Sequence, residues 1–161
     1  MPSTFRYGFY AGLLCAFVFG IYLFLLWGAE SQVRLHAEHL LHQVERRAWS
    51  NVGGFVAADY RDDWGDDREK LLNRLRTVGR YFFSLTITAS EARTQISPAA
   101  ATWQARIQMN GTGEAAAEIN SRVNSLTTPF VLHWRHESWR PWDWKLSRVE
   151  NKSLEIPEGE F

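Results

Sequence analysis

The segment FVLHWRHESWRPWDWKLSRVEN, residues 130–151, carries the clearest secondary-structure pattern in the chain. Apolar residues alternate with polar ones on both sides of a turn, and such alternation is typical of strands with one buried face. A five-residue turn at 139–143 sets His136 opposite Leu146 and brings five apolar side chains to one face: Phe130, Leu132, Trp134, Trp144 and Leu146. A four-residue turn would move the last two of these to the polar face, so the burial pattern favours the longer turn.

Four of the eight tryptophans of the chain lie in this segment. Trp134 and Trp144 fall on the apolar face and are predicted to be core residues. Trp139 and Trp142 fall at the hairpin tip beside Pro141, where fewer neighbours can cover them. We interpret this pair as an exposed contact site for a protein partner, a membrane surface or a glycan; the alternative is that both rings fold over the sheet end.

The same alternation at residues 85–89 and 102–109 predicts further antiparallel strands. Before them, apolar residues recur at helical intervals over residues 31–60 and again over 68–83. Two helices followed by a run of antiparallel strands indicate an α+β fold. Within it, Gly53-Gly54 predicts a bend in the first helix.

The start of the second helix is marked by acidic residues. Asp66, with Glu69 three positions later, predicts its N-terminal cap. The acid-rich segment 59–69 does not match a calcium-binding loop, because Trp64 stands where that loop requires glycine. Capping and the helix dipole explain these acids instead.

Residues 7–27 contain no charged side chain, and about 20 apolar residues suffice to cross a bilayer as a helix. The run is longer than the core of a signal peptide, and Trp27 stands where a cleavage site needs a small residue. We therefore predict an uncleaved transmembrane anchor. Behind a cytoplasmic head at 1–6, it would hold the rest of the protein on the periplasmic side of a bacterial inner membrane.

The predicted organisation continues with a juxtamembrane helical linker at 28–44, a folded domain at 45–156 and a tail at 157–161. Lysine and arginine number 18, as do aspartate and glutamate, so the formal net charge is zero. A neutral domain has no overall field to attract nucleic acid, and we expect no nucleic-acid partner. The one cysteine, Cys15, lies in the predicted span and does not indicate a redox compartment.

His36, His39 and His42 form the only histidine cluster. On a helix His36 and His42 lie about 120° apart, too far for three ligands to reach one ion. A pair could hold an ion weakly or meet the pair of a second chain, but a solvated helix face explains the pattern, and we expect no metal and no cofactor.

Four segments together suggest a family: WSNVGGFVAADYRDDWGDD (49–67), REKLLNRLRTVGRYF (68–82), TTPFVLHWRHESW (127–139) and DWKLSRVENKSLEI (143–156). They resemble the nuclear transport factor 2-like (NTF2-like) superfamily, which includes the SnoaL-like and ketosteroid isomerase-like domains. The closing pattern W-x-L-x-x-V, at Trp144, Leu146 and Val149, is typical of its last strand. The resemblance spans residues 45–156 and implies a cystatin-like cone of helices on a curved antiparallel sheet, often in a dimer.

Some members of that superfamily are enzymes, and many bind small molecules or proteins. Isomerase-like members need a carboxylate base and an oxyanion donor in the pocket, but neither Asp59 nor Tyr60 aligns with a catalytic position. The predicted inner face of the sheet carries Trp103 and Trp134 and no acid. We expect such bulky side chains to fill the interior.

The leading hypothesis is a membrane-anchored, non-enzymatic module for protein interaction or assembly at the cell envelope. It would bind the bilayer through residues 7–27 and a protein partner through Trp139 and Trp142, with a homodimer left open. The alternative is a binding module for an apolar small molecule or lipid, with five candidate pocket residues: Asp59, Tyr60, Trp103, Trp134 and His136.

A third hypothesis is an isomerase or hydrolase-like enzyme of the SnoaL type. It requires at least two of Asp59, Tyr60 and His136 to converge in one cavity. His136 points to the apolar face in the favoured register, where a buried imidazole needs a hydrogen bond. We interpret it as a structural histidine with that bond satisfied; the alternative is a ligand or a proton carrier.

Overall fold

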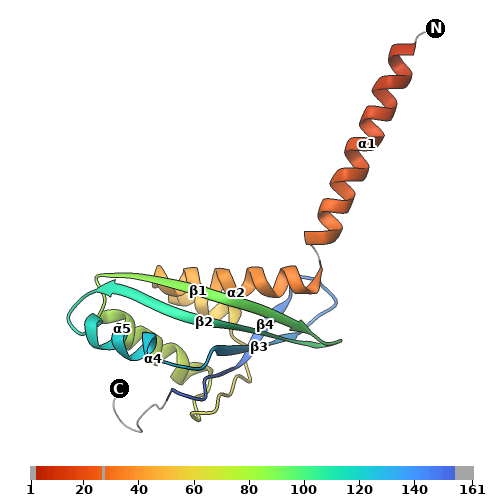
Figure 1. The fold of residues 1–161 in the computed structure, drawn as a ribbon. Coiled ribbons are helices and arrows are strands. Elements are labelled where there is room, and N and C mark those ends of the chain that lie inside the picture. The colour runs from red at the N-terminus through yellow and green to blue at the C-terminus, as the bar shows by residue number, and fades with distance from the viewer. Residues whose placement is uncertain (1–2, 27, 155–161) are drawn as a thin grey trace.

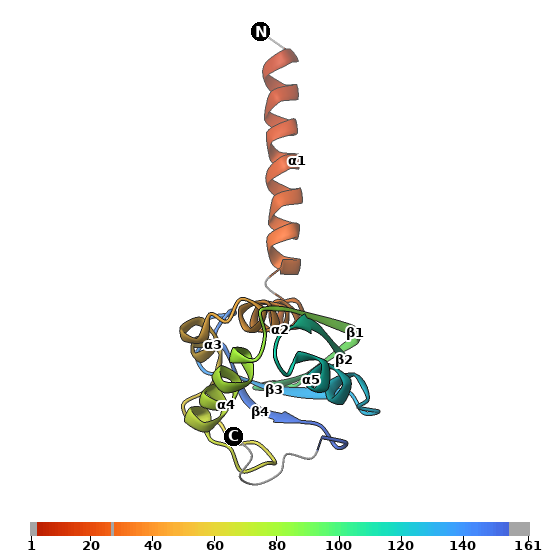
Figure 2. The same cartoon turned by 90° about the vertical axis from the view of Figure 1, so that its left-hand side faces the viewer.

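The computed structural model describes residues 3–26 and 28–154. The described residues form nine elements: α1 (Ser3–Leu26), α2 (Ala29–Glu45), α3 (Trp49–Phe55), α4 (Arg68–Arg80), β1 (Ser84–Ile96), β2 (Ala100–Thr112), α5 (Ala116–Asn124), β3 (Phe130–His136) and β4 (Trp144–Glu150). Helix α1 extends away from the others, which gather around one sheet (Figures 1 and 2). The predicted α+β fold is confirmed.

The sheet is antiparallel throughout, in the order β1-β2-β3-β4. Strands β1 and β2 form a long hairpin, and a bulge between Ser90 and Arg93 interrupts their pairing. Glu91 in this bulge has a positive φ of 54°. A bulge bends the strand that carries it and increases its twist, which contributes to the curvature of the sheet.

The hairpin of β3 and β4 confirms the predicted alternation and corrects the predicted register. His136 pairs with Trp144, a bulge lies between His133 and Trp134, and seven residues, 137–143, connect the strands. The predicted register, with His136 opposite Leu146, is therefore wrong by two positions between the bulge and the turn and by one position beyond the bulge. Because a shift of two residues leaves each side chain on its own face, four predicted core residues are buried as expected: Leu132, Trp134, Trp144 and Leu146.

The helical stretch predicted for residues 31–60 is interrupted before Gly53-Gly54. Helix α2 ends at Glu45, Arg47 has a positive φ of 55°, and α3 begins at Trp49. The Arg47 guanidinium donates hydrogen bonds of 2.7 and 3.1 Å to the carbonyl oxygens of Phe82 and Phe83. This distant contact stabilises the break at Arg47, whereas both glycines lie inside α3.

Helix α2 belongs to the folded domain. Its residues Val33 and Ala37 are fully buried, and Leu40 is nearly so. Figure 1 shows α2 lying along the sheet rather than continuing the direction of α1. Residues 28–44, predicted to be a linker, are thus part of the packed structure, because three apolar side chains on one face of this helix cover the sheet.

Two features of the remaining helices differ from prediction. The N-cap of α4 is Asp67, whose carboxylate accepts the backbone N–H of Lys70 at 2.9 Å. Asp66, which was predicted to be the cap, is buried and pairs with Arg74 instead. Helix α5 follows β2 in a stretch for which the sequence predicted no element. Its Asn124 side chain both accepts from the N–H and donates to the carbonyl oxygen of Met109, each at 2.8 Å.

Among the helices of the described residues, none is both long enough and apolar enough to cross a membrane. The predicted transmembrane anchor at 7–27 is not supported by this finding. Of the segments predicted around it, residues 1–2, Trp27 and the tail at 157–161 lie outside the described residues.

Candidate functional site

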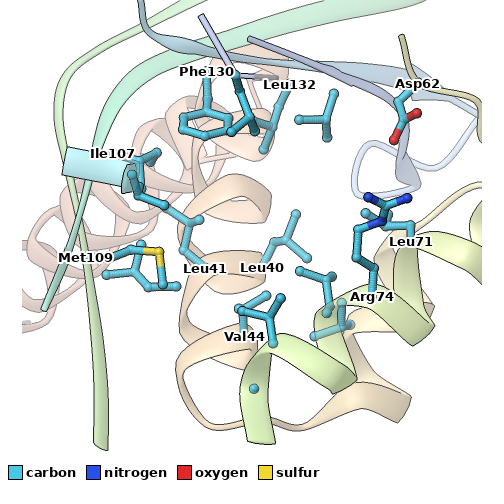
Figure 3. Close-up of a pocket in the computed structure, with 18 of the residues that line it drawn as sticks. Leu40, Leu41, Val44, Asp62, Leu71, Arg74, Ile107, Met109, Phe130 and Leu132 are labelled. Carbon is cyan, nitrogen blue, oxygen red and sulfur yellow. The ribbon is translucent and has the colours of Figure 1, made fainter. Parts of the chain in front are cut away.

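A cavity of about 360 Å³ lies between α2, α4, α5 and one face of the sheet. Its walls are almost entirely aliphatic or aromatic. Helices α2 and α4 contribute Leu40, Leu41, Val44, Leu71, Leu75 and Val78, and the four strands contribute Leu85, Ile87, Ile107, Met109, Phe130, Leu132, Leu146 and Val149. Figure 3 shows side chains from several of these elements around a common space. The expectation of a filled interior therefore does not hold for this part of the domain.

Trp103 and Trp134, the two largest fully buried side chains among the described residues, lie outside this cavity. Trp103 and Trp134 are each 1% exposed and pack in the part of the core that α2 covers. The ring of His36 on α2 approaches the Trp134 ring edge-on, with centroids 6.0 Å apart. The indoles of Trp103 and Trp134 fill the space between α2 and one part of the sheet. Smaller side chains line the rest of that face, and the cavity lies there.

One wall of the cavity carries a buried ion pair. Asp66 is 3% exposed, and its two carboxylate oxygens accept hydrogen bonds of 2.8 and 2.9 Å from Nε and a terminal nitrogen of Arg74. A two-point contact of this kind fixes the guanidinium and neutralises its charge locally. Arg74 projects from α4, and Asp66 immediately precedes the cap of that helix, so the pair joins the start of α4 to its second turn.

Asp62 lies on the same wall and is also fully engaged (Figure 3). One of its oxygens accepts the backbone N–H groups of Trp64 and Asp66 at 3.1 and 2.8 Å, and the other accepts the Tyr60 hydroxyl at 3.1 Å. Burial raises the pKa of Asp62 above its usual value. Burial and the neighbouring Asp62 also raise the pKa of Tyr60 well above its usual value. Both groups organise the loop before α4.

Helices α4 and α5 stand at the end of the domain remote from α1 (Figure 1), and both contribute to the cavity. From α5, Ile119 and Val123 add to the apolar lining. Arg122, one residue before Val123, also lines the cavity and is otherwise exposed to solvent. Its side chain has no hydrogen-bond or ion-pair partner among the described residues.

The five residues predicted to form a pocket do not line this cavity. Asp59 is on the surface, where Arg135 donates hydrogen bonds of 2.7 and 2.9 Å and holds the pKa of that carboxyl below its usual value. Tyr60 is 1% exposed, and its hydroxyl points to Asp62. Sequence analysis did not identify this cavity. Its lining consists of helix faces that were predicted to be core, together with acids that were interpreted as capping residues.

His136 lies at the other end of the sheet. Its Nε2 is 2.6 Å from the carbonyl oxygen of Arg140, and its ring packs against that of Trp144 at a tilt of 35°, with centroids 4.8 Å apart. Asp59, Tyr60 and His136 therefore do not converge in one cavity, and the condition set for the enzyme hypothesis is not met by these three residues. His136 has the hydrogen bond that a structural histidine requires.

Trp139 and Trp142 are exposed, as the sequence predicted, at 86% and 52%. The hairpin tip lies near the start of α2: Ala29, Trp139 and Ile96 line a shallow depression there together with His136 and Trp144. Ile96 is itself exposed. The rings thus do not fold over the sheet end, and their proposed contact role stays a prediction.

No protein-family model matches the chain. No curated protein matches it in sequence. Solved structures do share its fold. An NTF2-like protein of unknown function from Pseudomonas putida KT2440 aligns with a TM-score of 0.57 at 9% identity, covering 75% of this chain and 83% of the other.

A candidate dehydratase of the NTF2-like family from Streptomyces avermitilis aligns with a TM-score of 0.57 at 12% identity, covering 75% of this chain and 93% of the other. A candidate ketosteroid isomerase from Shewanella frigidimarina NCIMB 400 aligns with a TM-score of 0.57 at 16% identity, covering 76% and 95%. At these identities the similarity establishes the fold alone: the chain has the NTF2-like, cystatin-like α+β fold that its sequence resembled.

Proposed function

We propose that this NTF2-like domain binds an apolar small molecule in the cavity between α2, α4, α5 and the sheet. The observation that carries the proposal is the cavity itself, whose 360 Å³ fall within the usual range of about 300–1,000 Å³ for ligand sites. An apolar cavity of about 150 Å³ accommodates benzene. This larger one suits a molecule of two rings or an aliphatic chain of similar bulk.

The polar groups of the cavity favour binding over catalysis. Asp66 is neutralised by Arg74, and the oxygens of Asp62 accept from two backbone N–H groups and from Tyr60. A general base must be able to reach the proton that it removes. Here the carboxylates of Asp62 and Asp66 are both bound to partners within the protein. The lining is therefore suited to excluding water and to recognising a ligand by its shape.

Binding is tested by titrating the full chain with N-phenyl-1-naphthylamine, a neutral two-ring fluorescent probe. We expect saturable binding of one probe per chain, with quenching of tryptophan emission because Trp49 and Trp64 line the cavity. Val78→Phe combined with Val123→Phe fills the cavity from α4 and α5 and should abolish this saturable phase.

The matched control is Val131→Phe, the same chemical change on β3 outside the cavity lining. It should bind the probe as the unaltered chain does. Each protein is compared in the same non-ionic detergent, so that partition of the probe into micelles is common to all. Equal saturable binding by a folded double variant would overturn the proposal.

A second proposal concerns location, and it is favoured by the exposed apolar side chains at one end of the molecule. Phe9, Leu13 and Phe17 on α1 are about 60–66% exposed, and Trp139 is 86% exposed beside the start of α2. We propose that α1 associates with a bacterial inner membrane, that the domain lies in the periplasm, and that Trp139 and Trp142 contact a protein partner there.

The location is tested with reporters fused after Phe161. Alkaline phosphatase should be active and a cytoplasm-restricted fluorescent protein dark; the opposite pattern would reject a periplasmic domain. For the contact role, Trp139→Ala with Trp142→Ala should lose crosslinks in intact cells while the domain stays folded. Phe83→Ala is the matched control, because Phe83 is 78% exposed at the opposite end of β1.

A further inference from the structure

We propose that the ligand of the cavity is an anionic amphiphile, with its apolar body among α2, α4 and the sheet and a carboxylate head held by Arg122. This inference rests on the proposed binding function and specifies the class of ligand. It follows from the different environments of the two arginines that line the cavity, Arg74 and Arg122.

Arg74 is already satisfied inside the protein. Asp66 meets it with two hydrogen bonds, and the pair is largely withdrawn from solvent, with the Arg74 and Asp66 side chains 29% and 5% exposed. The negative charge of Asp62 faces backbone N–H groups and the Tyr60 hydroxyl. Three of the four charged side chains that line the cavity are therefore committed to partners within the protein.

Arg122 differs because it lines the cavity and its guanidinium has no partner among the described residues. It lies in the last turn of α5, directly before the cavity-lining Val123, and no described residue pairs with its side chain. A basic residue in the last turn also complements the helix dipole, but that interaction does not require the side chain to reach the apolar lining. Within the described part of the chain, a positive charge without a paired acid thus adjoins an apolar chamber.

The chemistry that satisfies both features is amphipathic. An apolar body gains free energy by leaving water for the chamber, and a carboxylate can accept two parallel N–H groups from the fork of an arginine. A neutral apolar molecule would leave Arg122 solvated and gain nothing from it. A compact polar anion would leave the apolar chamber unused. Arg122 therefore favours a ligand with a carboxylate head group, and the chamber favours a ligand with an apolar tail.

The experiment measures displacement of N-phenyl-1-naphthylamine from the full chain by laurate and by 1-dodecanol, which share a twelve-carbon chain and differ in the head group. Laurate should displace the probe at lower concentration than dodecanol. Arg122→Gln should weaken laurate about tenfold, the effect of losing one charge-assisted contact, and should affect dodecanol and the probe far less, since neither carries a charge. Arg122→Lys, which keeps the charge but not the fork, should weaken laurate less.

Arg76→Gln is the matched control, since Arg76 is outside the cavity lining and bonds to Asn73 in the same helix. It should behave as the unaltered chain. Equal displacement by laurate from the Arg122→Gln and unaltered proteins would overturn the anionic head group while leaving the binding function intact. Absence of saturable probe binding in the unaltered chain would instead remove the binding function, so the two failures are distinguishable.

Discussion

Tyr60, Asp62, Asp66 and Arg74 form a connected polar cluster beside the cavity. Each of them is buried or half-buried, and each is paired with a member of the cluster. A buried polar group without a partner costs about 1–3 kcal/mol, and more when it is charged. The cluster is therefore stable only when complete, and it fixes the loop that leads into α4.

The ion pair can be tested by Arg74→Met, which keeps the apolar stem of the side chain and removes its charge. Asp66 would then be buried without a counter-ion, and we expect the free energy of unfolding to fall by about 2–4 kcal/mol. Urea unfolding followed by circular dichroism measures the change. Adding Asp66→Asn should restore part of the loss, because a neutral amide costs less to bury. Arg76→Met, outside the cluster, should change stability little.

The raised pKa of Tyr60 predicts that the folded protein loses stability at alkaline pH. Its pKa is raised in the folded protein by burial, whereas in the unfolded chain it is about 10. Above that pH the unfolded phenol ionises and the folded one does not, so the stability present below pH 10 is lost as pH rises, by up to about 1.4 kcal/mol per pH unit.

Tyr60→Phe removes this contribution. Free energies of unfolding measured in urea at pH 9, 10 and 11 should decline less steeply for the variant, although its stability at neutral pH falls by about 1 kcal/mol through loss of the bond to Asp62. Equal slopes for the two proteins would show that Tyr60 ionises as readily when folded as when unfolded.

At the scale of elements, the contact between α3 and α4 depends on one glycine. A Cβ at Gly79 would lie 2.5 and 2.9 Å from two ring carbons of Trp49, closer than real side chains approach. The indole of Trp49 therefore lies directly against the backbone of α4, and it lines the cavity from there. A glycine within a helix otherwise lowers stability relative to alanine by about 1 kcal/mol.

We expect Gly79→Ala to lower the thermal midpoint, because overpacking of about 1–3 kcal/mol exceeds the gain in helix propensity. Gly54→Ala is the matched control: Gly54 also lies in a helix, and its Cβ would meet nothing within 4 Å. That variant should be neutral or slightly stabilising. If Gly79→Ala were equally harmless, the close contact with Trp49 would not contribute to stability.

The β3–β4 hairpin shows which parts of an element follow from sequence. Alternation identified both strands and their buried faces, including Trp134 and Trp144. It did not give the pairing, because a shift of two residues preserves the faces and the bulge at His133 has no clear sequence pattern. Likewise, the break after α2 depends on bonds from Arg47 to Phe82 and Phe83, which lie 35 and 36 residues away.

At the scale of the whole molecule, α2 closes the domain. Val33, Ala37 and Leu40 cover the sheet where Trp103 and Trp134 lie. A chain that begins at Gly28 should therefore unfold cooperatively. A chain that begins at Arg46 should not, since Trp103 and Trp134 would then face water. Thermal unfolding by near-ultraviolet circular dichroism distinguishes them. A cooperative transition in the shorter chain would contradict the role of α2.

The sequence by itself determined the α+β class, the run of antiparallel strands after the first helices and the burial of Trp134 and Trp144, and it placed Trp139 and Trp142 at a hairpin tip. These features follow from local periodicity and from turn residues. The cavity, the Asp66–Arg74 pair and the placement of Arg122 beside the cavity were decided only by the tertiary structure. Periodicity tells which face of a helix turns inward, but the volume left between facing elements depends on how closely they approach, and that distance is set by contacts between residues far apart in the chain.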